Sequence, residues 1–281
     1  MKKKDLLSDF QDYLRNKNLA PNTVRTYSGS IRLFLNMYPD LSQKNLKKYR
    51  SVLISRYKPA TVNQRIHAMN SYLRFLTETR EEEFLFLKDY QLSSVKLQQK
   101  TFHDNTISNE DYALLKRRLK ADGNDFWYFV VHFLAATGVR VSELTKIKVE
   151  HLSHGYLDLY SKGSKIRRIY LPDFLCKEAL EWCSKKGQRT GFLFINRQGK
   201  PISSRGIHSQ LKHYALRYGI DPNTVYPHSF RHRFAKNFLA KFNDIALLAD
   251  LMGHGSIETT RIYLTCSSRE QQKLLDKLIT W

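Results

Sequence analysis

Apolar side chains in the first ninety residues recur every three or four positions, a spacing that places them on one face of a helix. Four such stripes are present, and they begin at Leu6, Val24, Leu41 and Val62. A proline stands a few positions before the second and the fourth stripe, where its fixed φ suits the first turn of a helix. The sequence therefore predicts four helices within residues 1–91.

The last of these helices carries polar side chains that suit contact with DNA. Lysine, arginine and side-chain amides lie at or between its apolar positions, and the residues concerned are Lys58, Asn63, Gln64, Arg65 and Arg74. Such side chains contact phosphates and base edges when a helical module grips a duplex. A helical bundle with an ordinary solvated surface is the alternative that this pattern alone leaves open.

Helical periodicity fails between about residues 91 and 105. The run S-S-V-K-L-Q-Q-K-T-F-H-D-N is polar and basic rather than rich in glycine and serine, so we expect it to lie along another surface. This break predicts a helical domain over residues 1–91, a linker over 92–105 and a second domain over 106–281.

The second domain is predicted to be mixed. Ser108 and Asp111 form a helix start of the capping type, and an apolar helix is expected over residues 126–137. The stretch from Gly155 to Pro172 alternates around a Lys-Gly-Ser-Lys turn, which indicates a β-hairpin. Further helices are expected over 173–187, 203–218, 228–241, 244–252 and 269–279, with a short strand over 192–195. The fold class is therefore mainly α with a small antiparallel β-sheet.

Charge narrows the choice of partner. Lysine and arginine number 47 against 26 acidic residues, a net charge of +21. Self-repulsion of this size favours a polyanionic partner, and nucleic acid is the first candidate. An anionic membrane fits less well, because the basic residues are spread along the whole chain and the longest apolar stretch, residues 126–136, is too short to span a bilayer.

Cysteine usage and the N-terminal residues bear on the compartment. Three cysteines with no C-x-x-C spacing argue against a zinc ribbon or a disulfide framework. The start M-K-K-K-D-L-L-S-D-F has no apolar run of the kind that follows the basic start of a signal peptide. We therefore expect a cytoplasmic protein associated with the nucleoid.

Four short segments of the second domain carry candidate chemistry. They are A-T-G-V-R-V-S-E-L (residues 136–144), the hairpin turn with its lysine, P-H-S-F-R-H-R-F (227–234) and L-M-G-H-G-S-I-E-T-T-R-I-Y-L (251–264). Each has an ordinary structural explanation by itself: an arginine after a helix-ending glycine, a solvated turn lysine, a polar helix face, a core tyrosine. The third also offers a helix N-terminus, which suits a phosphate.

Taken together and in this order, the four segments resemble the tyrosine recombinase (phage integrase) family. The matched pattern is A-T-G-x-R-x-S-E-L, a hairpin lysine, H-x-x-R, a G-H pair and T-x-x-Y, with M-G-H where L-G-H is usual. The N-terminal helices resemble the family's SAM-like core-binding domain, so the resemblance covers nearly the whole chain. It implies a four-helix core-binding domain followed by an α+β catalytic domain, in the simple Xer-like arrangement without an added arm-binding domain.

The resemblance implies a nucleophile and a phosphate clamp. Tyr263 attacks the scissile phosphodiester and leaves a 3′-phosphotyrosine and a free 5′-hydroxyl. Arg140 and Arg231 hold the non-bridging oxygens, a task that suits the planar fork of a guanidinium. A free tyrosine has a pKa near 10, so cationic neighbours or a base must activate it.

The resemblance also implies supporting roles. His254 donates a further hydrogen bond to the phosphate, and His228 manages the tyrosine proton. Lys162 is the general acid for the leaving 5′-oxygen, while Glu143 orients the cationic groups without touching DNA. We expect no metal and no other cofactor, because the sequence has neither a two-metal carboxylate cluster nor a phosphate-binding G-x-x-x-x-G-K-[ST] loop.

The implied activity is site-specific recombination of double-stranded DNA through a Holliday junction, for integration and excision, inversion or resolution. A type IB topoisomerase shares the same chemistry and is the alternative. Recombination joins two duplexes, so the resemblance implies a homo-tetramer on DNA, with a paralogous recombinase or accessory protein as a further partner. The apolar face of residues 269–279 suits exchange of that helix between protomers, or its return to its own domain.

Overall fold

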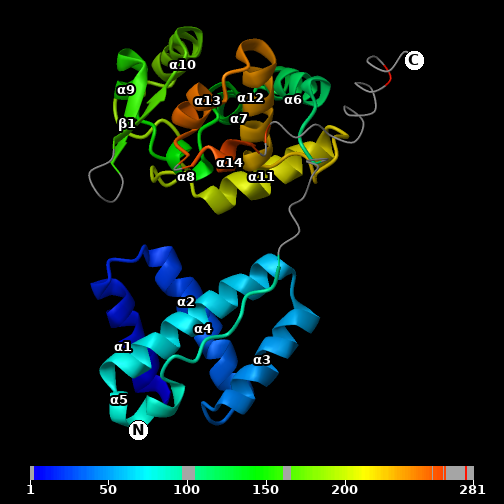
Figure 1. The fold of residues 1–281 in the computed structure, drawn as a ribbon. Coiled ribbons are helices and arrows are strands. Elements are labelled where there is room, and N and C mark those ends of the chain that lie inside the picture. Colours follow the sequence, from blue (N-terminus) through cyan, green and yellow to red (C-terminus); the bar gives the residue numbers. More distant parts are fainter. Residues whose placement is uncertain are drawn as a thin grey trace. The chain divides into compact units, whose positions relative to one another are not determined.

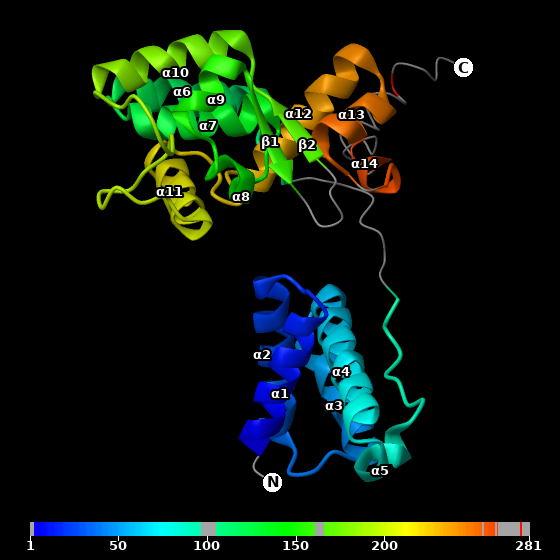
Figure 2. The same cartoon turned by 90° about the vertical axis from the view of Figure 1, so that its left-hand side faces the viewer.

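The structure is a computed structural model that describes residues 3–96, 105–160, 166–254, 256–261, 263 and 276 (Figures 1 and 2). The chain divides into two compact units, residues 1–99 and 100–281, each of which is described by itself. No helix within the described ranges is long and apolar enough to cross a membrane.

The first unit is wholly helical. Its elements are α1 (Lys3–Asn16), α2 (Pro21–Met37), α3 (Gln43–Arg56), α4 (Pro59–Thr79), α5 (Glu81–Phe84) and the 3₁₀ turn η1 (Leu85–Leu87). The four predicted helices are confirmed, and α2 and α4 both begin at the expected proline. Helix α4 packs against the other three, and its buried face is formed by Ile66, Met69 and Leu73. The short α5 and η1 were not predicted, because neither is long enough to show a helical period.

Two asparagines of α4 bind the segment that follows this bundle. Asn63 accepts the backbone N–H of Val95 (2.8 Å) and donates to its carbonyl oxygen (2.9 Å). Asn70 does the same for Leu92, at 2.9 and 3.0 Å. The first residues of the predicted linker are thereby held along α4. The side-chain amide of Asn63, which the sequence suggested for DNA contact, is committed to this backbone.

The second unit places helices around the central α7. Its elements are α6 (Asn109–Ala121), α7 (Asp125–Thr137), α8 (Val141–Leu144), α9 (Val149–His154), β1 (Tyr156–Tyr160), β2 (Ile166–Tyr170), α10 (Asp173–Lys185), α11 (Ser204–Arg217), α12 (Pro227–Phe242), α13 (Ile245–Met252) and α14 (Glu258–Arg261). Helix α7 packs against α6, α10 and α12 and is buried along most of its length. The predicted cap at Ser108 is confirmed, since its hydroxyl accepts the N–H of Asp111 at 2.9 Å.

The predicted hairpin is confirmed as an antiparallel pair of strands, β1 and β2. Asp158 and Arg168 lie opposite each other and form two hydrogen bonds of 2.8 Å. The turn that contains Lys162 lies outside the described residues, as does almost all of the predicted helix 269–279. The predicted strand over 192–195 is wrong: it contributes only isolated bridges at its two ends, from Phe192 and Ile195.

The start of the second unit is tied to α12. The backbone N–H of Ile107 donates to the hydroxyl of Ser229 at 2.7 Å, and both residues are buried. Ser229 lies in the first turn of α12, the helix that also carries the predicted pair His228 and Arg231. The segment that enters this unit therefore ends on the same helical turn as two candidate site residues.

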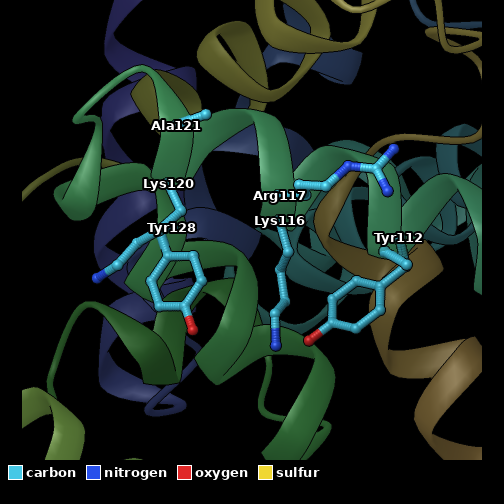
Figure 3. A pocket seen from close by; sticks show the side chains of 7 residues that line it. Tyr112, Lys116, Arg117, Lys120, Ala121 and Tyr128 are labelled. Carbon is cyan, nitrogen blue, oxygen red and sulfur yellow. The ribbon is translucent and has the colours of Figure 1, made fainter.

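A shallow hollow of about 490 Å³ lies over α6 and α7, and it shares no residue with the candidate site (Figure 3). Tyr112, Lys116, Lys120 and Tyr128 line it, together with Ala113, Arg117 and Ala121. The ammonium groups of Lys116 and Lys120 lie 5.5 and 4.8 Å from the ring centre of Tyr128. Its lysines are therefore engaged with aromatic rings.

Candidate active site

Arg231 forms the buried centre of the candidate site. Its side chain is 1% exposed, and its guanidinium donates to the carbonyl oxygens of Gly138 (2.5 Å) and Met252 (2.7 Å). The same guanidinium lies 2.9 Å from Nε2 of His254. Burial, with the nearby charge of Arg140, lowers the pKa of Arg231 to about 10. Among the described residues, the positive charge of the buried Arg231 is therefore held by the dipoles of two backbone carbonyl groups and not by a directly bonded carboxylate.

Arg140 is the N-cap residue of α8 and lies two positions after Gly138, which ends α7. Glu143 accepts its backbone N–H (2.8 Å) and its Nη1 (2.9 Å), while its Nη2 donates to the carbonyl oxygen of Gly253 (3.1 Å). The side chain of Arg140 is 39% exposed, so solvent reaches it. Burial alone would raise the pKa of Glu143, but the hydrogen bonds from Arg140 and the neighbouring charge of Arg167 lower it. Glu143 is therefore ionised and fixes Arg140.

Arg167 is a third guanidinium that the sequence did not single out. It lies on β2, donates to Glu143 and to the carbonyl oxygen of Leu251, and is nearly as buried as Glu143 itself. Its neighbour Arg168 faces outward to Asp158 instead. The sequence does contain one indication of this role. Successive side chains of a strand point to opposite faces, so one of the two adjacent arginines Arg167 and Arg168 had to face the interior.

His254 follows α13 and contacts two site residues through its ring nitrogens. Nε2 lies 2.9 Å from Arg231, and Nδ1 lies 2.8 Å from the hydroxyl of the fully buried Thr260. Burial, followed by the charges of the three arginines and His228, lowers the pKa of His254 to about 4. The imidazole is therefore neutral at physiological pH.

Tyr263 follows α14 and is 6% exposed. It packs with Leu239, Leu248 and Met252, and its ring lies nearly parallel to that of His254, with 6.0 Å between centroids. Burial raises the pKa of the Tyr263 hydroxyl, and its interaction with Arg231 acts in the opposite direction without cancelling that rise. The hydroxyl therefore keeps its proton at neutral pH in the DNA-free protein.

Two histidines of α12 form a chain of rings toward Tyr263. His228 is exposed, and its ring centroid lies 4.7 Å from that of His232. The buried His232 lies 5.0 Å from the ring of Tyr263. His232 was not predicted as a site residue, although it stands four residues after His228 and so one helical turn away.

The structure thus brings together Arg140, Glu143, Arg231, His254 and Tyr263, while Lys162 lies outside the described residues. The residues predicted to contact DNA belong to the first unit. Lys58, Gln64 and Arg74 are exposed, and the guanidinium of Arg65 lies 4.6 Å from the ring centre of Tyr57. The side-chain amide of Asn63 hydrogen-bonds the backbone of Val95.

Gly253 has no room for a side chain. It ends α13 at φ +60°, and a Cβ there would overlap the side chain of Arg167. We expect Gly253→Ala to lower the free energy of unfolding by about 2–4 kcal/mol, since left-handed strain costs about 1–2 kcal/mol and Arg167 must also leave its partners. Urea unfolding measures this loss.

Gly219→Ala is the matched control. Gly219 has φ +70°, but a Cβ there would meet no atom within 4 Å. It should lose only the backbone contribution, about 1–2 kcal/mol. Equal losses of unfolding free energy in the two variants would show that the overlap of the added Cβ at Gly253 with Arg167 costs no stability.

Two family models match this chain. The phage integrase family model matches residues 126–270, and the model of the phage integrase N-terminal SAM-like domain matches residues 6–82. The first match spans the segments that carry Arg140, Arg231, His254 and Tyr263.

Similar proteins include the tyrosine recombinase XerD of Oceanobacillus iheyensis, 29% identical over 92% of each chain. The tyrosine recombinase XerA of Pyrococcus furiosus is 28% identical over 98% of this chain and 96% of its own. Among solved structures, the XerH site-specific recombinase bound to palindromic difH substrate superposes with a TM-score of 0.70 at 17% identity, over 92% of this chain and 81% of that one. A lambda integrase dimer bound to a core site gives 0.65 at 17% identity, over 94% and 95%.

Proposed function

Because this chain belongs to the phage integrase family of tyrosine recombinases, we propose that Arg140, Arg231, His254 and Tyr263 form the site where it cuts and rejoins DNA. The activity is site-specific recombination, and a type IB topoisomerase is not favoured, since the relatives that match nearly the whole chain are recombinases. One observation carries the assignment of the site: segments as far as 113 positions apart in the sequence meet around a buried arginine beside a tyrosine.

Tyr263 is the proposed nucleophile. Its hydroxyl oxygen forms a bond to the scissile phosphorus as the bond from phosphorus to the 5′-oxygen breaks, which gives a 3′-phosphotyrosine. The tyrosine proton must leave, and the ring chain through His232 to His228 supports an exit in that direction. The departing 5′-oxygen takes a proton, and we assign that donation to Lys162. Rejoining is the reverse, so the energy of the broken bond is kept in the phosphotyrosine.

Arg140 and Arg231 are the proposed phosphate clamp. The exposure of Arg140 lets a phosphate reach its guanidinium, while buried Arg231 adds a charge that water screens little. Fixed cationic donors of this kind stabilise the charge that develops on phosphoryl oxygens in the transition state. Glu143 and Arg167 would hold Arg140 and the loop at Gly253 in place without touching DNA.

The proposed partner is double-stranded DNA, and solved structures of similar fold are described as bound to a palindromic difH substrate and to a core site. We propose that Lys58, Gln64, Arg65 and Arg74 contact it from the first unit, and the net charge of +21 supports a strong electrostatic contribution. Because the proposed partner is double-stranded DNA, we also propose that the protein acts on the DNA of the nucleoid.

The domain limits that we propose are those expected from the sequence: a first domain over residues 1–91, a linker over 92–105 and a second domain over 106–281.

A trapping experiment tests the reaction. Duplexes nicked near the cleavage point lose the 5′-hydroxyl fragment after cleavage, so the covalent protein–DNA complex accumulates. We expect such a complex with duplexes taken from the gene's own surroundings and none with scrambled duplexes. Covalent complex of equal amount on every duplex would point to a topoisomerase-like activity instead.

We further propose that the chain acts as a homo-tetramer on DNA, with residues 269–279 exchanged between protomers. Two duplexes and four strand cuts require several active sites, and Leu274, Leu275, Leu278 and Ile279 give that segment an apolar face. A chain that ends at Ser268 should still bind DNA yet lose recombination. Gel-shift and recombination assays measure both, and full recombination by the shortened chain would contradict the exchange.

A further inference from the structure

Donor and acceptor groups around His254 determine where its proton lies. The guanidinium of Arg231 lies 2.9 Å from Nε2, and a guanidinium carries donors only. This contact therefore favours a lone pair on Nε2. Because a neutral imidazole has one N–H, that proton lies on Nδ1, which then donates to the hydroxyl of Thr260 at 2.8 Å.

The charged form of His254 would fit this environment poorly. An imidazolium would direct an N–H at the N–H of Arg231, and Arg140 and Arg167 add further positive charge close by. The ring of Tyr263 lies nearly parallel to that of His254, and His228 is a further titratable group that acts on His254 among the residues that the structure describes. Glu143 is occupied by Arg140 and Arg167 rather than by the imidazole.

Thr260 is also well placed to orient the nucleophile. It is 0% exposed, and its carbonyl oxygen accepts the backbone N–H of Tyr263 at 3.0 Å. One residue therefore contacts His254 through its side chain and Tyr263 through its backbone. A hydroxyl at this position can accept a proton from Nδ1, whereas an apolar side chain of the same size cannot.

We propose that Thr260 is a positioning residue that keeps the proton of His254 on Nδ1, so that Nε2 orients the guanidinium of Arg231 in the DNA-free site. His254 then acts first as a hydrogen-bond acceptor for the buried arginine. It can donate to a phosphate from Nε2 only after gaining a proton there. The consequence for catalysis rests on the proposed function, whereas the position of the proton does not.

Histidine labelled with ¹⁵N tests the proposal by NMR on the full chain without DNA. The spectrum of His254→Gln identifies the His254 signals by their loss. The wild type should show a protonated Nδ1 and an unprotonated Nε2, and Thr260→Val should lose that preference. Thr260→Ser, which keeps the hydroxyl, should restore it. A wild-type proton on Nε2, or an unchanged tautomer in Thr260→Val, would overturn the proposal.

Covalent trapping on nicked duplexes gives the second readout. We expect Thr260→Val to cut on the order of tenfold more slowly while binding DNA as the wild type does, and Thr260→Ser to recover most of the rate. Wild-type cutting by Thr260→Val, or a Thr260→Ser variant as slow as Thr260→Val, would show that the hydroxyl does not control the rate and would overturn the positioning role. If the wild type itself fails to cut, the proposed function fails, while the tautomer measurement still decides the role of Thr260.

Discussion

Tyr263→Phe should form no covalent complex with a nicked DNA substrate that traps the wild type. The substitution removes only the oxygen that attacks phosphorus, and the phenyl ring keeps its packing against Leu239, Leu248 and Met252. DNA binding should remain within about twofold of the wild type, because phosphate contacts dominate affinity for a duplex. Denaturing gels measure the covalent product and gel shifts measure binding.

Tyr226→Phe supplies the matched control. Tyr226 precedes α12 as its N-cap residue, and burial raises the pKa of its hydroxyl just as it does for Tyr263. This variant should cut DNA at the wild-type rate. Covalent DNA in Tyr263→Phe would contradict the assignment of the nucleophile, and its loss in Tyr226→Phe would mean that any buried tyrosine hydroxyl of this unit is required.

Arg231→Lys should lower the cleavage rate by a factor of about 100 to 1,000, the effect typical of losing one transition-state donor. An ammonium is a point donor and cannot reproduce the fork that reaches Gly138, Met252 and His254 together. At least one buried carbonyl then lacks its partner, which costs about 1–3 kcal/mol of stability. Single-turnover trapping and urea unfolding measure the two effects separately.

Arg168→Lys is the control for this substitution. Arg168 is 44% exposed and pairs with Asp158 on the hairpin, and exposed ion pairs add little to stability. It should cut DNA at nearly the wild-type rate. A similar loss in both variants would trace the effect to general loss of positive charge, and wild-type cutting by a folded Arg231→Lys would remove Arg231 from the clamp.

Much of this fold could be predicted from the sequence, because its longer helices show a clear period and begin at marked positions such as Pro21 and Ser108. The failures have physical causes. The six residues of α9 are too few to display a period. The run 192–195 looks like a strand in the sequence because all four of its residues are apolar. Leu193 and Phe194 are indeed buried, but the run pairs with no neighbouring strand and forms only isolated bridges.

Residues of the candidate site could be predicted from the sequence where a motif gives both the residue type and its order along the chain. Arg167 and His232 were missed because their roles depend on contacts that the order of residues does not show, and Thr260 was recognised only as a position of the T-x-x-Y motif, without a role. Arg167 meets Glu143 from 24 positions away, and strand alternation indicates only that one of two arginines turns inward. The side-chain amide of Asn63, which was predicted to contact DNA, hydrogen-bonds the backbone of Val95, because an amide that suits DNA suits a neighbouring backbone equally well.

The hydrogen bond between Ile107 and Ser229 has a mechanical consequence. The segment that enters the second unit is fastened to the first turn of α12, one position after His228 and two before Arg231. Tension along that segment is therefore delivered to the turn that supports the buried guanidinium, and not to a remote surface. A substitution that displaces Ile107 would therefore be felt first at the helical turn that carries His228 and Arg231.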